Sequence, residues 1–322
     1  MDNLELIAIS NGCSSVGTLV STCADSLKKS FITIKVSNFA DTETNIIFKD
    51  YEKFKNKNIL FIHQFSFKNE CSINRQLMNF LFVVDTLKNS GAKKIVSFLP
   101  YMPYARQEGS LSGEGGGLLG ALTNLFKCSQ IDKVIACDLH EPSVISKLPI
   151  DFEEIKLDFF WADIISKNKF IDFEKRKKDI ILASPDKGGI RRVKKIASIL
   201  NLDFVSVLKK RIGFDQTVAK TLDGDVKDKF VILIDDIVDT AGTAINACNM
   251  LIEKGAKEVI GCFSHGVLSA NSTENIEKSK FSKIFVTNTI ILSEQDISKK
   301  VVEVSSDKFM CEKLFDLVKV EV

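Results

Sequence analysis

Residues 230–243 read FVILIDDIVDTAGT, and the fold assignment depends on this stretch. An apolar run, 230–234, is followed by Asp235 and Asp236, and Asp239 then opens the segment DTAGT. An apolar run without polar alternation predicts a strand that is covered on both faces, as in a parallel sheet. Open α/β sheets bind their ligands at the carboxyl ends of such strands. The stretch therefore predicts an α/β protein with a ligand site directly after residue 234.

Two kinds of binding group follow the predicted strand. Asp235 and Asp236 should project to opposite sides of the strand axis, where carboxylates can accept hydrogen bonds from vicinal hydroxyls or contact a metal that carries phosphates. Residues 239–243 lead into a predicted helix, whose backbone N–H groups, together with two threonine hydroxyls and a glycine, can bind an anion. Hydroxyls at one end and a phosphate at the other predict a sugar phosphate. The alternative is a helix N-cap with acids stabilised by the helix dipole and solvent.

Short apolar runs recur along the whole chain and alternate with segments of helical periodicity. The runs predicted as strands are 4–9, 59–63, 94–99, 133–137, 180–183, 204–208, 230–234, 258–263 and 283–287. Between them lie segments such as 243–254, where the apolar residues Ile245, Cys248 and Ile252 recur at helical spacing and predict a helix. This alternation predicts an α/β fold with right-handed crossovers.

Two segments from different halves of the chain are similar. FVVDTLKNSGAKKIVSFL (82–99) and NACNMLIEKGAKEVIGCF (246–263) both read as a helix, then Gly-Ala-Lys, then a strand. Glycine at that position is a common helix terminator. We predict an N-terminal domain over 1–155 and a similar C-terminal domain over 156–322, whose last helix can pack back on the first domain. The alternative is chance similarity of one helix–turn–strand unit.

The overall composition is that of a globular protein. The 322 residues are 45% hydrophobic and 27% charged, and 44 Lys and Arg against 42 Asp and Glu give a net charge of +2. This balance gives no electrostatic reason to expect nucleic acid or an anionic membrane as a partner. The N-terminus MDNLELIAIS does not read as a secretory signal, and no apolar run approaches the length of a membrane span. We expect a cytoplasmic protein.

Cysteine and histidine usage argues against a zinc site. None of the eight cysteines forms a C-x-x-C pair, and Cys137, Cys248 and Cys262 lie inside apolar runs. We therefore expect the cysteines to be buried, reduced thiols that act as small hydrophobic side chains. The chain has three histidines, which leaves few candidate ligands.

VILIDDIVDTAGT resembles the phosphoribosyl-diphosphate binding motif shared by type I phosphoribosyltransferases and ribose-phosphate diphosphokinases. Further motifs are similar to the diphosphokinase family in order and spacing: NFADTE (38–43), LPYMPYARQE (99–108), ACDLHEPSV (136–144), ASPDKGG (183–189) and SHGVLS (264–269). Simple phosphoribosyltransferases are usually shorter and lack this set. The resemblance to the ribose-phosphate diphosphokinase (phosphoribosyl-diphosphate synthetase) family extends from residue 4 to the C-terminus. It implies two similar phosphoribosyltransferase-like (type I) domains, each a mostly parallel sheet flanked by helices.

The resemblance also implies roles for particular residues. The ATP-binding residues would be Phe39, Asp41, Glu43, Arg106, Gln107 and Glu108, all in the N-terminal domain. The ribose 5-phosphate-binding residues would be Asp235, Asp236, Asp239, Thr240, Ala241, Gly242 and Thr243. The diphosphate loop would contain Asp186, Gly188 and Gly189; the Mg²⁺ ligands would be His140 and Asp186; and the catalytic residues would be Lys209, Arg211 and His140.

The side chains with catalytic or metal roles also have a chemical interpretation of their own. His140 follows an apolar run, and an imidazole at a strand end can ligate or hydrogen-bond a magnesium–phosphate complex; a structural histidine is the alternative. Lys209 and Arg211 share one side of a predicted strand. Two cations at that position would offset charge on a transferring diphosphoryl group, and the alternative is a solvated pair on an edge strand.

Two departures from the family pattern fall on the nucleotide side. Where the family usually has Arg-Gln-Asp-Arg, this chain has Arg-Gln-Glu-Gly ending at Gly109, and the loop 109–117 contains no basic residue. Thr42 stands where the family usually has glycine. Loss of a cation near the ATP phosphates and the entropy cost of ordering a glycine-rich loop predict weakened nucleotide binding.

We therefore expect an enzyme that transfers the diphosphoryl group of ATP to O1 of ribose 5-phosphate, with Mg²⁺, and gives 5-phosphoribosyl 1-diphosphate and AMP. The resemblance implies a homo-oligomer, built from dimers and up to a hexamer, with active sites near subunit interfaces, because the residues matching Phe39, Asp41 and Glu43 reach adenine bound mainly by a neighbouring subunit. The alternatives are a catalytically weak or silent regulatory paralogue and a phosphoribosyltransferase.

Overall fold

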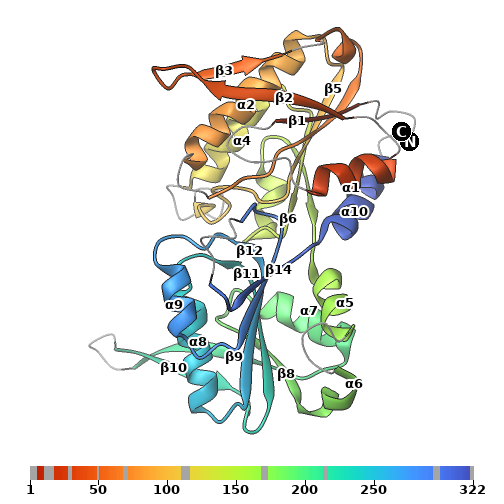
Figure 1. Cartoon of the computed structure of the whole chain (residues 1–322). Coiled ribbons are helices and arrows are strands. Elements are labelled where there is room, and N and C mark those ends of the chain that lie inside the picture. Colours follow the sequence, from red (N-terminus) through yellow and green to blue (C-terminus); the bar gives the residue numbers. More distant parts are fainter. Residues whose placement is uncertain are drawn as a thin grey trace. The chain divides into compact units, whose positions relative to one another are not determined.

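The computed structural model divides into two compact units (Figure 1). Unit 1 comprises Met1–Ile155, Thr289–Leu292 and Ser305–Val322, and unit 2 comprises Lys156–Asn288 and Ser293–Val304. The structure describes residues 6–10, 18–27, 31–48, 51–67, 72–109, 117–167, 173–212, 217–292 and 298–319. No helix in these ranges is both long and apolar enough to cross a membrane.

Unit 1 is built around a seven-stranded sheet in the order β3-β2-β1-β4-β5-β6-β7, as far as the described residues show. Its strands are β1 (Leu6–Ser10), β2 (Phe31–Asn38), β3 (Thr44–Ile47), β4 (Asn58–Ile62), β5 (Lys94–Leu99), β6 (Lys133–Cys137) and β7 (Asp151–Ile155). Its helices are α1 (Thr18–Leu27), α2 (Ile73–Asn89), α4 (Leu118–Cys128) and α10 (Asp307–Lys319). The pairing is parallel throughout except between β2 and β3.

Unit 2 repeats this arrangement with strands in the order β10-β9-β8-β11-β12-β13-β14. Its strands are β8 (Ile180–Ser184), β9 (Phe204–Ile212), β10 (Thr217–Asp223), β11 (Phe230–Val238), β12 (Glu258–Gly266), β13 (Lys283–Thr287) and β14 (Val301–Val304). Its helices are α5 (Asp158–Ser166), α6 (Phe173–Arg176), α7 (Ile190–Leu200), α8 (Gly242–Glu253) and α9 (Ser272–Lys278). Among the strands that the structure describes in this sheet, β9 and β10 pair antiparallel and the other neighbours pair parallel. The prediction of mostly parallel sheets flanked by helices is confirmed.

The similarity between residues 82–99 and 246–263 corresponds to a repeated structure. Gly91 follows α2 with φ +84° and Gly255 follows α8 with φ +96°, a left-handed conformation that glycine adopts without a Cβ penalty. The carbonyl of Gly91 accepts a hydrogen bond from the N–H of Asn56 at 2.8 Å, and that of Gly255 from the N–H of Asp228 at 2.9 Å. The same helix–turn–strand unit therefore occurs once in each half.

Five strands of the structure were not predicted from the sequence, namely β2, β3, β7, β10 and β14. β2 alternates exposed and buried side chains, and β14 buries only its first and last residues. A search for continuously apolar runs does not detect strands of this kind. β11 is also longer than predicted, because Asp235 and Ile237 still pair with β12. Asp235 and Asp236 therefore lie within a strand and not after its end.

The prediction for the cysteines is partly wrong. Cys23 of α1 and Cys311 of α10 form a disulfide, with Cα atoms 5.4 Å apart, and Cys128 is exposed. The two bonded cysteines are 288 residues apart in sequence, so spacing gave no sign that α1 and α10 pack together. Cys248 is buried and unbonded as expected, and burial raises the pKa of its thiol to about 12, which keeps it protonated and unreactive.

Candidate active site

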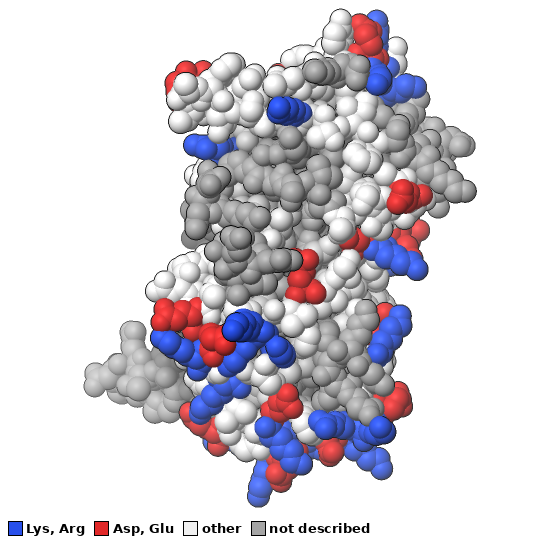
Figure 2. Space-filling view, in the orientation of Figure 1, with Lys and Arg blue, Asp and Glu red and all other residues white. Residues whose placement is uncertain are grey.

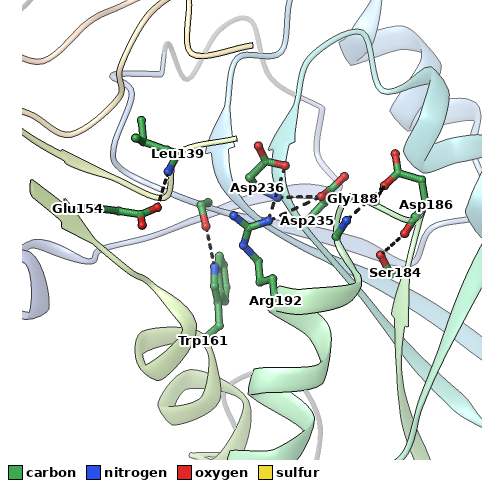
Figure 3. A network of polar contacts seen from close by, with 11 residues as sticks. Leu139, Glu154, Trp161, Ser184, Asp186, Gly188, Arg192, Asp235 and Asp236 are labelled. Carbon is green, nitrogen blue, oxygen red and sulfur yellow. Dashed lines mark hydrogen bonds and ion pairs between the residues drawn. The ribbon is translucent and has the colours of Figure 1, made fainter. Parts of the chain in front are cut away.

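The two acids of the opening stretch lie beside an arginine from a neighbouring helix (Figure 3). Nη1 of Arg192, in the first turn of α7, is 3.9 Å from Oδ1 of Asp235 and 3.7 Å from Oδ1 of Asp236. Asp236 is buried and Asp235 partly exposed, as alternation along a strand requires. The N–H of Asp236 donates to Oδ1 of Asp235 at 3.0 Å. Two carboxylates and one guanidinium thus form a compact cluster on β11 and α7.

The electrostatics of this cluster are dominated by burial and by the two neighbouring charges. Burial raises the pKa of Asp235 well above its usual range, and the adjacent charge of Asp236 raises it further. Arg192 acts in the opposite direction because a nearby cation favours the ionised carboxylate. The pKa of Asp235 therefore reflects its burial and Asp236, opposed by Arg192.

Residues 239–243 connect β11 to α8 and present accessible groups at the start of a helix. Thr240, Gly242 and Thr243 are exposed, and Ala241 adopts a left-handed conformation with φ +65° just before the helix. The first N–H groups of a helix have no partner within it and carry the positive end of the helix dipole. The described geometry thus fits an anion at the N-terminus of α8.

Asp239 is held by a residue from another motif. Its Oδ1 accepts a short hydrogen bond from the hydroxyl of Ser269. Ser269 ends the segment SHGVLS, whose first residue, Ser264, accepts a hydrogen bond from Nε1 of Trp161 at 3.3 Å (Figure 3). The hydroxyl of Thr287 donates a hydrogen bond to the carbonyl of Ser264 at 2.6 Å. These contacts fix the 264–269 segment beside the 239–243 loop.

The loop after β8 folds around Asp186. Its Oδ1 accepts hydrogen bonds from the N–H of Gly188 at 2.8 Å and of Gly189 at 3.3 Å, while the hydroxyl of Ser184 donates to the Asp186 carbonyl at 2.7 Å. β8 and β11 are parallel neighbours, so this loop and the acid pair lie at the same edge of the sheet. A Cβ at Gly189 would be 2.6 Å from Oγ of Ser184 and 3.2 Å from Oδ1 of Asp235. Glycine is therefore needed where the loop approaches the acids.

The residues proposed for the transition state lie on β9. The backbone at Lys209 and Arg211 belongs to this strand and pairs with Lys220 and Val218 of β10. The strand is longer than the predicted 204–208 run and includes both positions. Their side chains lie outside the described part of the structure, so their catalytic role remains a prediction.

Unit 1 places the first group of predicted ATP-binding residues on the turn between β2 and β3. Phe39 is 55% exposed, its N–H donates to the Glu43 carbonyl at 2.9 Å, and the N–H of Glu43 donates to Oδ1 of Asp41 at 3.0 Å. Thr42 adopts a left-handed conformation with φ +74°. A β-branched residue is strained in that conformation, and this explains why glycine would be the more usual residue at this turn.

The second group, Arg106, Gln107 and Glu108, lies in the connection between β5 and α4. The N–H of Gln107 donates to the Tyr104 carbonyl at 2.9 Å, and the N–H of Leu119 donates to the Gln107 carbonyl at 3.2 Å. Arg106 and Gln107 are exposed, whereas Glu108 is partly buried. Gly109 is described, but most of the glycine-rich loop, 110–116, lies outside the described residues.

His140 is exposed on the turn that follows β6. The turn is fixed by β7, since the N–H of Leu139 donates to Oε1 of Glu154 at 2.9 Å (Figure 3). The N–H of Asp138 also donates to the Ile155 carbonyl at 3.1 Å. Asp138 has φ +36°. His140 thus lies just after this strand, as the sequence predicted, and its metal and catalytic roles stay predictions.

The chemistry of Asp186 fits a magnesium ion that is shared with a substrate. In the described ranges, no group of three or more His, Cys, Asp or Glu side chains could hold a metal by itself. Magnesium is usually bound through one or two carboxylates plus water and substrate phosphates, and not in an all-protein cage. A single partly exposed carboxylate beside a glycine loop suits that type of site.

Sequence reasoning missed Arg192, Ser269 and Glu154. Arg192 had a detectable signal, because it precedes Val193 and lies one turn before Ile196 on the buried side of α7, where a cation is unusual. Ser269 lies in a recognised motif but was given no role. Nothing in the local sequence of Glu154 indicates that it bonds to the turn before His140.

The fold and the site define an α/β protein of the phosphoribosyltransferase-like class, made of two similar units of which one carries an acid pair and two glycine-containing loops. A crystal structure of phosphoribosylpyrophosphate synthetase from Mycobacterium smegmatis superposes with a TM-score of 0.84 at 24% identity, covering 98% of this chain and 99% of that one. The predicted fold class is confirmed by this similarity.

Sequence comparison gives the family. Residues 9–114 match the N-terminal domain of ribose phosphate pyrophosphokinase, and residues 203–321 match the phosphoribosyl synthetase-associated domain. Ribose-phosphate pyrophosphokinase of Campylobacter jejuni is 36% identical over 273 residues (84% of this chain, 83% of the relative), and that of Helicobacter hepaticus is 36% identical over 290 residues (89% and 87%). The chain belongs to the ribose-phosphate pyrophosphokinase family, and the predictions of that family and of an enzyme are confirmed.

Proposed function

We propose that this chain transfers the β,γ-diphosphoryl group of ATP to O1 of ribose 5-phosphate. The proposal is carried by the acid pair Asp235–Asp236, which lies at one sheet edge with the Asp186–Gly189 loop and directly precedes the 239–243 loop. A sugar phosphate with an incoming diphosphate needs hydroxyl acceptors between two anion-binding loops. Family membership supports the same reaction.

Each part of unit 2 has a role in this reaction. Asp235 and Asp236 accept hydrogen bonds from the ribose hydroxyls, and residues 239–243 bind the 5-phosphate at the N-terminus of α8. Gly188 and Gly189 receive the diphosphate. Because the Asp186 carboxylate accepts hydrogen bonds from both of these N–H groups, it must release them when the diphosphate binds there.

The chemical step is a single displacement at phosphorus. The anomeric hydroxyl oxygen forms a bond to the β-phosphorus, the bond from that phosphorus to the oxygen shared with the α-phosphorus breaks, and this oxygen leaves with AMP. The hydroxyl proton is released to solvent. Lys209 and Arg211 offset the negative charge on the equatorial oxygens, so that catalysis is positioning and electrostatic stabilisation without a covalent enzyme intermediate.

We assign ATP to Phe39, Asp41 and Glu43 on the β2–β3 turn and to Arg106, Gln107 and Glu108 after β5. An exposed aromatic ring on a turn suits stacking against adenine. The candidate Mg²⁺ ligands are Asp186 and His140, and the ion would supply positive charge that offsets the charge of the ATP phosphates. A cytoplasmic location is part of the same proposal, because ATP and sugar phosphates are intracellular metabolites.

We also propose that a second copy of this chain binds on one helical face of unit 1. Four apolar side chains are exposed on two neighbouring helices, Met78 and Phe82 on α2 and Leu118 and Leu125 on α4. The helices are joined beneath this face by the rings of Phe80 and Phe126, whose centroids are 5.3 Å apart. Grouped exposed apolar side chains are typical of association surfaces. Over the visible face of unit 2, by contrast, acidic and basic residues are interspersed (Figure 2).

A weak or silent regulatory subunit is the second candidate. It is favoured by Gly109, which leaves the ATP segment without a second arginine, and by the strained Thr42 on the other ATP segment. Unit 2 shows no comparable departure among the motif residues recognised in the sequence.

The test is a coupled assay for AMP with ATP, ribose 5-phosphate and Mg²⁺. We expect AMP to form only when both substrates are present, and Lys209→Ala to abolish most of the turnover. A protein that binds ribose 5-phosphate but forms no AMP would be the silent subunit. Release of diphosphate from 5-phosphoribosyl 1-diphosphate with a purine base, without AMP from ATP, would instead indicate a phosphoribosyltransferase.

A further inference from the structure

Arg192 occupies an unfavourable position for a cation. It is the third residue of α7, close to the positive end of the helix dipole, and its side chain is only 13% exposed. Burying a charged group is costly unless an opposite charge lies beside it. Arg191, the preceding residue on the same helix, is exposed. The two arginines thus have the same charge and sequence neighbourhood but very different surroundings.

The surroundings that compensate Arg192 are the two acids of β11. Its Nη1 lies within 3.9 Å of one carboxylate oxygen of each. Both distances exceed those of a hydrogen bond, so these contacts are ion pairs. One guanidinium nitrogen is therefore shared almost equally between Asp235 and Asp236.

The acids in turn depend on this charge. The charged groups acting on Asp235 are Asp236 of the same strand, Arg192 of α7 and Asp186 of the loop between β8 and α7. Two of these three are negative. Without Arg192, three acids would remain at one edge of the sheet, and adjacent carboxylates without a counter-charge repel each other and take up a proton. A protonated carboxyl group has lost part of its capacity to accept hydrogen bonds from hydroxyls.

We propose that Arg192 is a positioning residue for the ribose hydroxyls: it holds the adjacent carboxyl groups of Asp235 and Asp236 together as hydrogen-bond acceptors without itself contacting the sugar. The inference rests on the proposed function in one respect, namely that these two acids bind ribose. It adds a residue outside every motif recognised in the sequence.

The test is calorimetric titration of ribose 5-phosphate into the full chain with Mg²⁺, for wild type, Arg192→Gln, Arg192→Lys and the matched control Arg191→Gln. Arg192→Gln should weaken binding about tenfold to hundredfold, as expected for loss of a charged partner, and Arg192→Lys should recover part of the affinity. Arg191→Gln should bind as the wild type does. If Arg192 acted only through the shape and packing of its planar guanidinium group, lysine would not restore the affinity, because lysine keeps the positive charge but lacks that geometry.

The pH dependence separates positioning from a general loss of folding. Both proteins should bind more tightly as the pH rises and the acids lose their proton, but Arg192→Gln should need a higher pH than the wild type to reach its full affinity. If Arg192→Gln does not fold, the lysine variant provides the test through its intermediate affinity. Wild-type affinity and pH dependence in Arg192→Gln would overturn the inference while leaving the proposed function intact. Failure of the wild type itself to bind ribose 5-phosphate would contradict the assignment of the acids to ribose and the inference together.

Discussion

At the scale of single residues, the site depends on side chains and loops that lie unusually close to one another. Gly189 brings the Asp186 loop against both Ser184 and Asp235, and Arg192 brings a cation against two carboxylates. The motif containing Gly189 was recognisable in the sequence, because glycine after an acid at a strand end indicates an anion-binding loop. The partner of Arg192 was not recognisable, because α7 and β11 meet only in the folded unit.

Gly189→Ala should therefore impair both folding and ligand binding. The added Cβ would lie 2.6 Å from Oγ of Ser184, closer than real contacts allow, and overpacking of this kind costs about 1–3 kcal/mol. Urea unfolding would measure the loss, and titration with ribose 5-phosphate would report the displacement of Asp235. In Gly189→Ala/Ser184→Ala the clashing hydroxyl is absent, so that variant should recover stability. Equal stability of the two variants would contradict the clash.

A second residue-scale prediction concerns His63, which is 4% exposed among aromatic rings. Burial lowers the pKa of His63 from 6.5 to about 4. Below pH 6.5 the unfolded chain takes up a proton that the folded protein does not bind, so stability falls as the pH drops from 6.5 to 4 and then levels off. This group alone should lower the free energy of unfolding by about 2 kcal/mol between pH 7 and pH 5.

Urea unfolding at both pH values checks this prediction. The variant His63→Phe, which keeps a ring but cannot titrate, serves as the control and should show a smaller loss between pH 7 and pH 5. An identical loss in both proteins would assign the acid sensitivity to other groups.

At the scale of elements, the sequence was most informative where burial is complete. β6 and β8 are buried at every residue and were predicted with their correct starting residues. β10 was missed as an antiparallel strand at the edge of its sheet, and β2 was missed because its buried side chains alternate with exposed or partly exposed ones. α8 was predicted over 243–254 and spans Gly242–Glu253. The predicted and observed ends each differ by one residue, which is within the usual uncertainty of helix boundaries.

The connection between β5 and α4 contains Gly109, one of the two departures from the family pattern. Gly109→Arg should lower the Michaelis constant for ATP and leave that for ribose 5-phosphate unchanged. A hydrogen bond to a charged group contributes about 1.5–3 kcal/mol, but ordering a glycine-rich loop reduces this, so we expect a gain of about tenfold.

Steady-state kinetics with Gly109→Gln as a neutral control would test this prediction. The glutamine variant should behave like the wild type because it has a polar side chain without the charge. An equal Michaelis constant in all three proteins would show that the missing arginine does not limit ATP binding.

At the scale of the whole molecule, the two units have the same strand arrangement, but the pair of adjacent acids on the central strand occurs in unit 2 and not at the matching position of unit 1. His63 follows Asn56 by the same number of residues as Asp235 follows Asp228, and Asn56 and Asp228 bond to the equivalent glycines Gly91 and Gly255. Unit 1 thus has His63 and Gln64, both buried, where unit 2 has two acids. Because buried neutral side chains cannot replace the carboxylates that we propose to bind hydroxyls, we assign the proposed sugar site to unit 2. The internal similarity predicted the repeat, but not which residues had diverged.

The assembly is testable through the exposed face of unit 1. Phe82→Glu should reduce the molar mass measured by light scattering after gel filtration, because a charge in the centre of an apolar interface cannot be desolvated cheaply. Phe159→Glu is the matched control, since Phe159 is also exposed but lies on α5 of unit 2. Equal masses for both variants and the wild type would contradict the proposed α2–α4 interface.

The central claim is that the diphosphoryl group moves intact from ATP to ribose 5-phosphate, and ³¹P NMR of the products tests it most directly. After incubation with both substrates and Mg²⁺, we expect equal amounts of AMP and a ribose carrying a 5-phosphate and two coupled phosphorus signals at C1. The coupling shows that the two transferred phosphorus atoms are still bonded through one oxygen. ADP with a single phosphate at C1 would mean transfer of one phosphoryl group, and unchanged ATP and ribose 5-phosphate would mean no catalysis; either result would contradict the account.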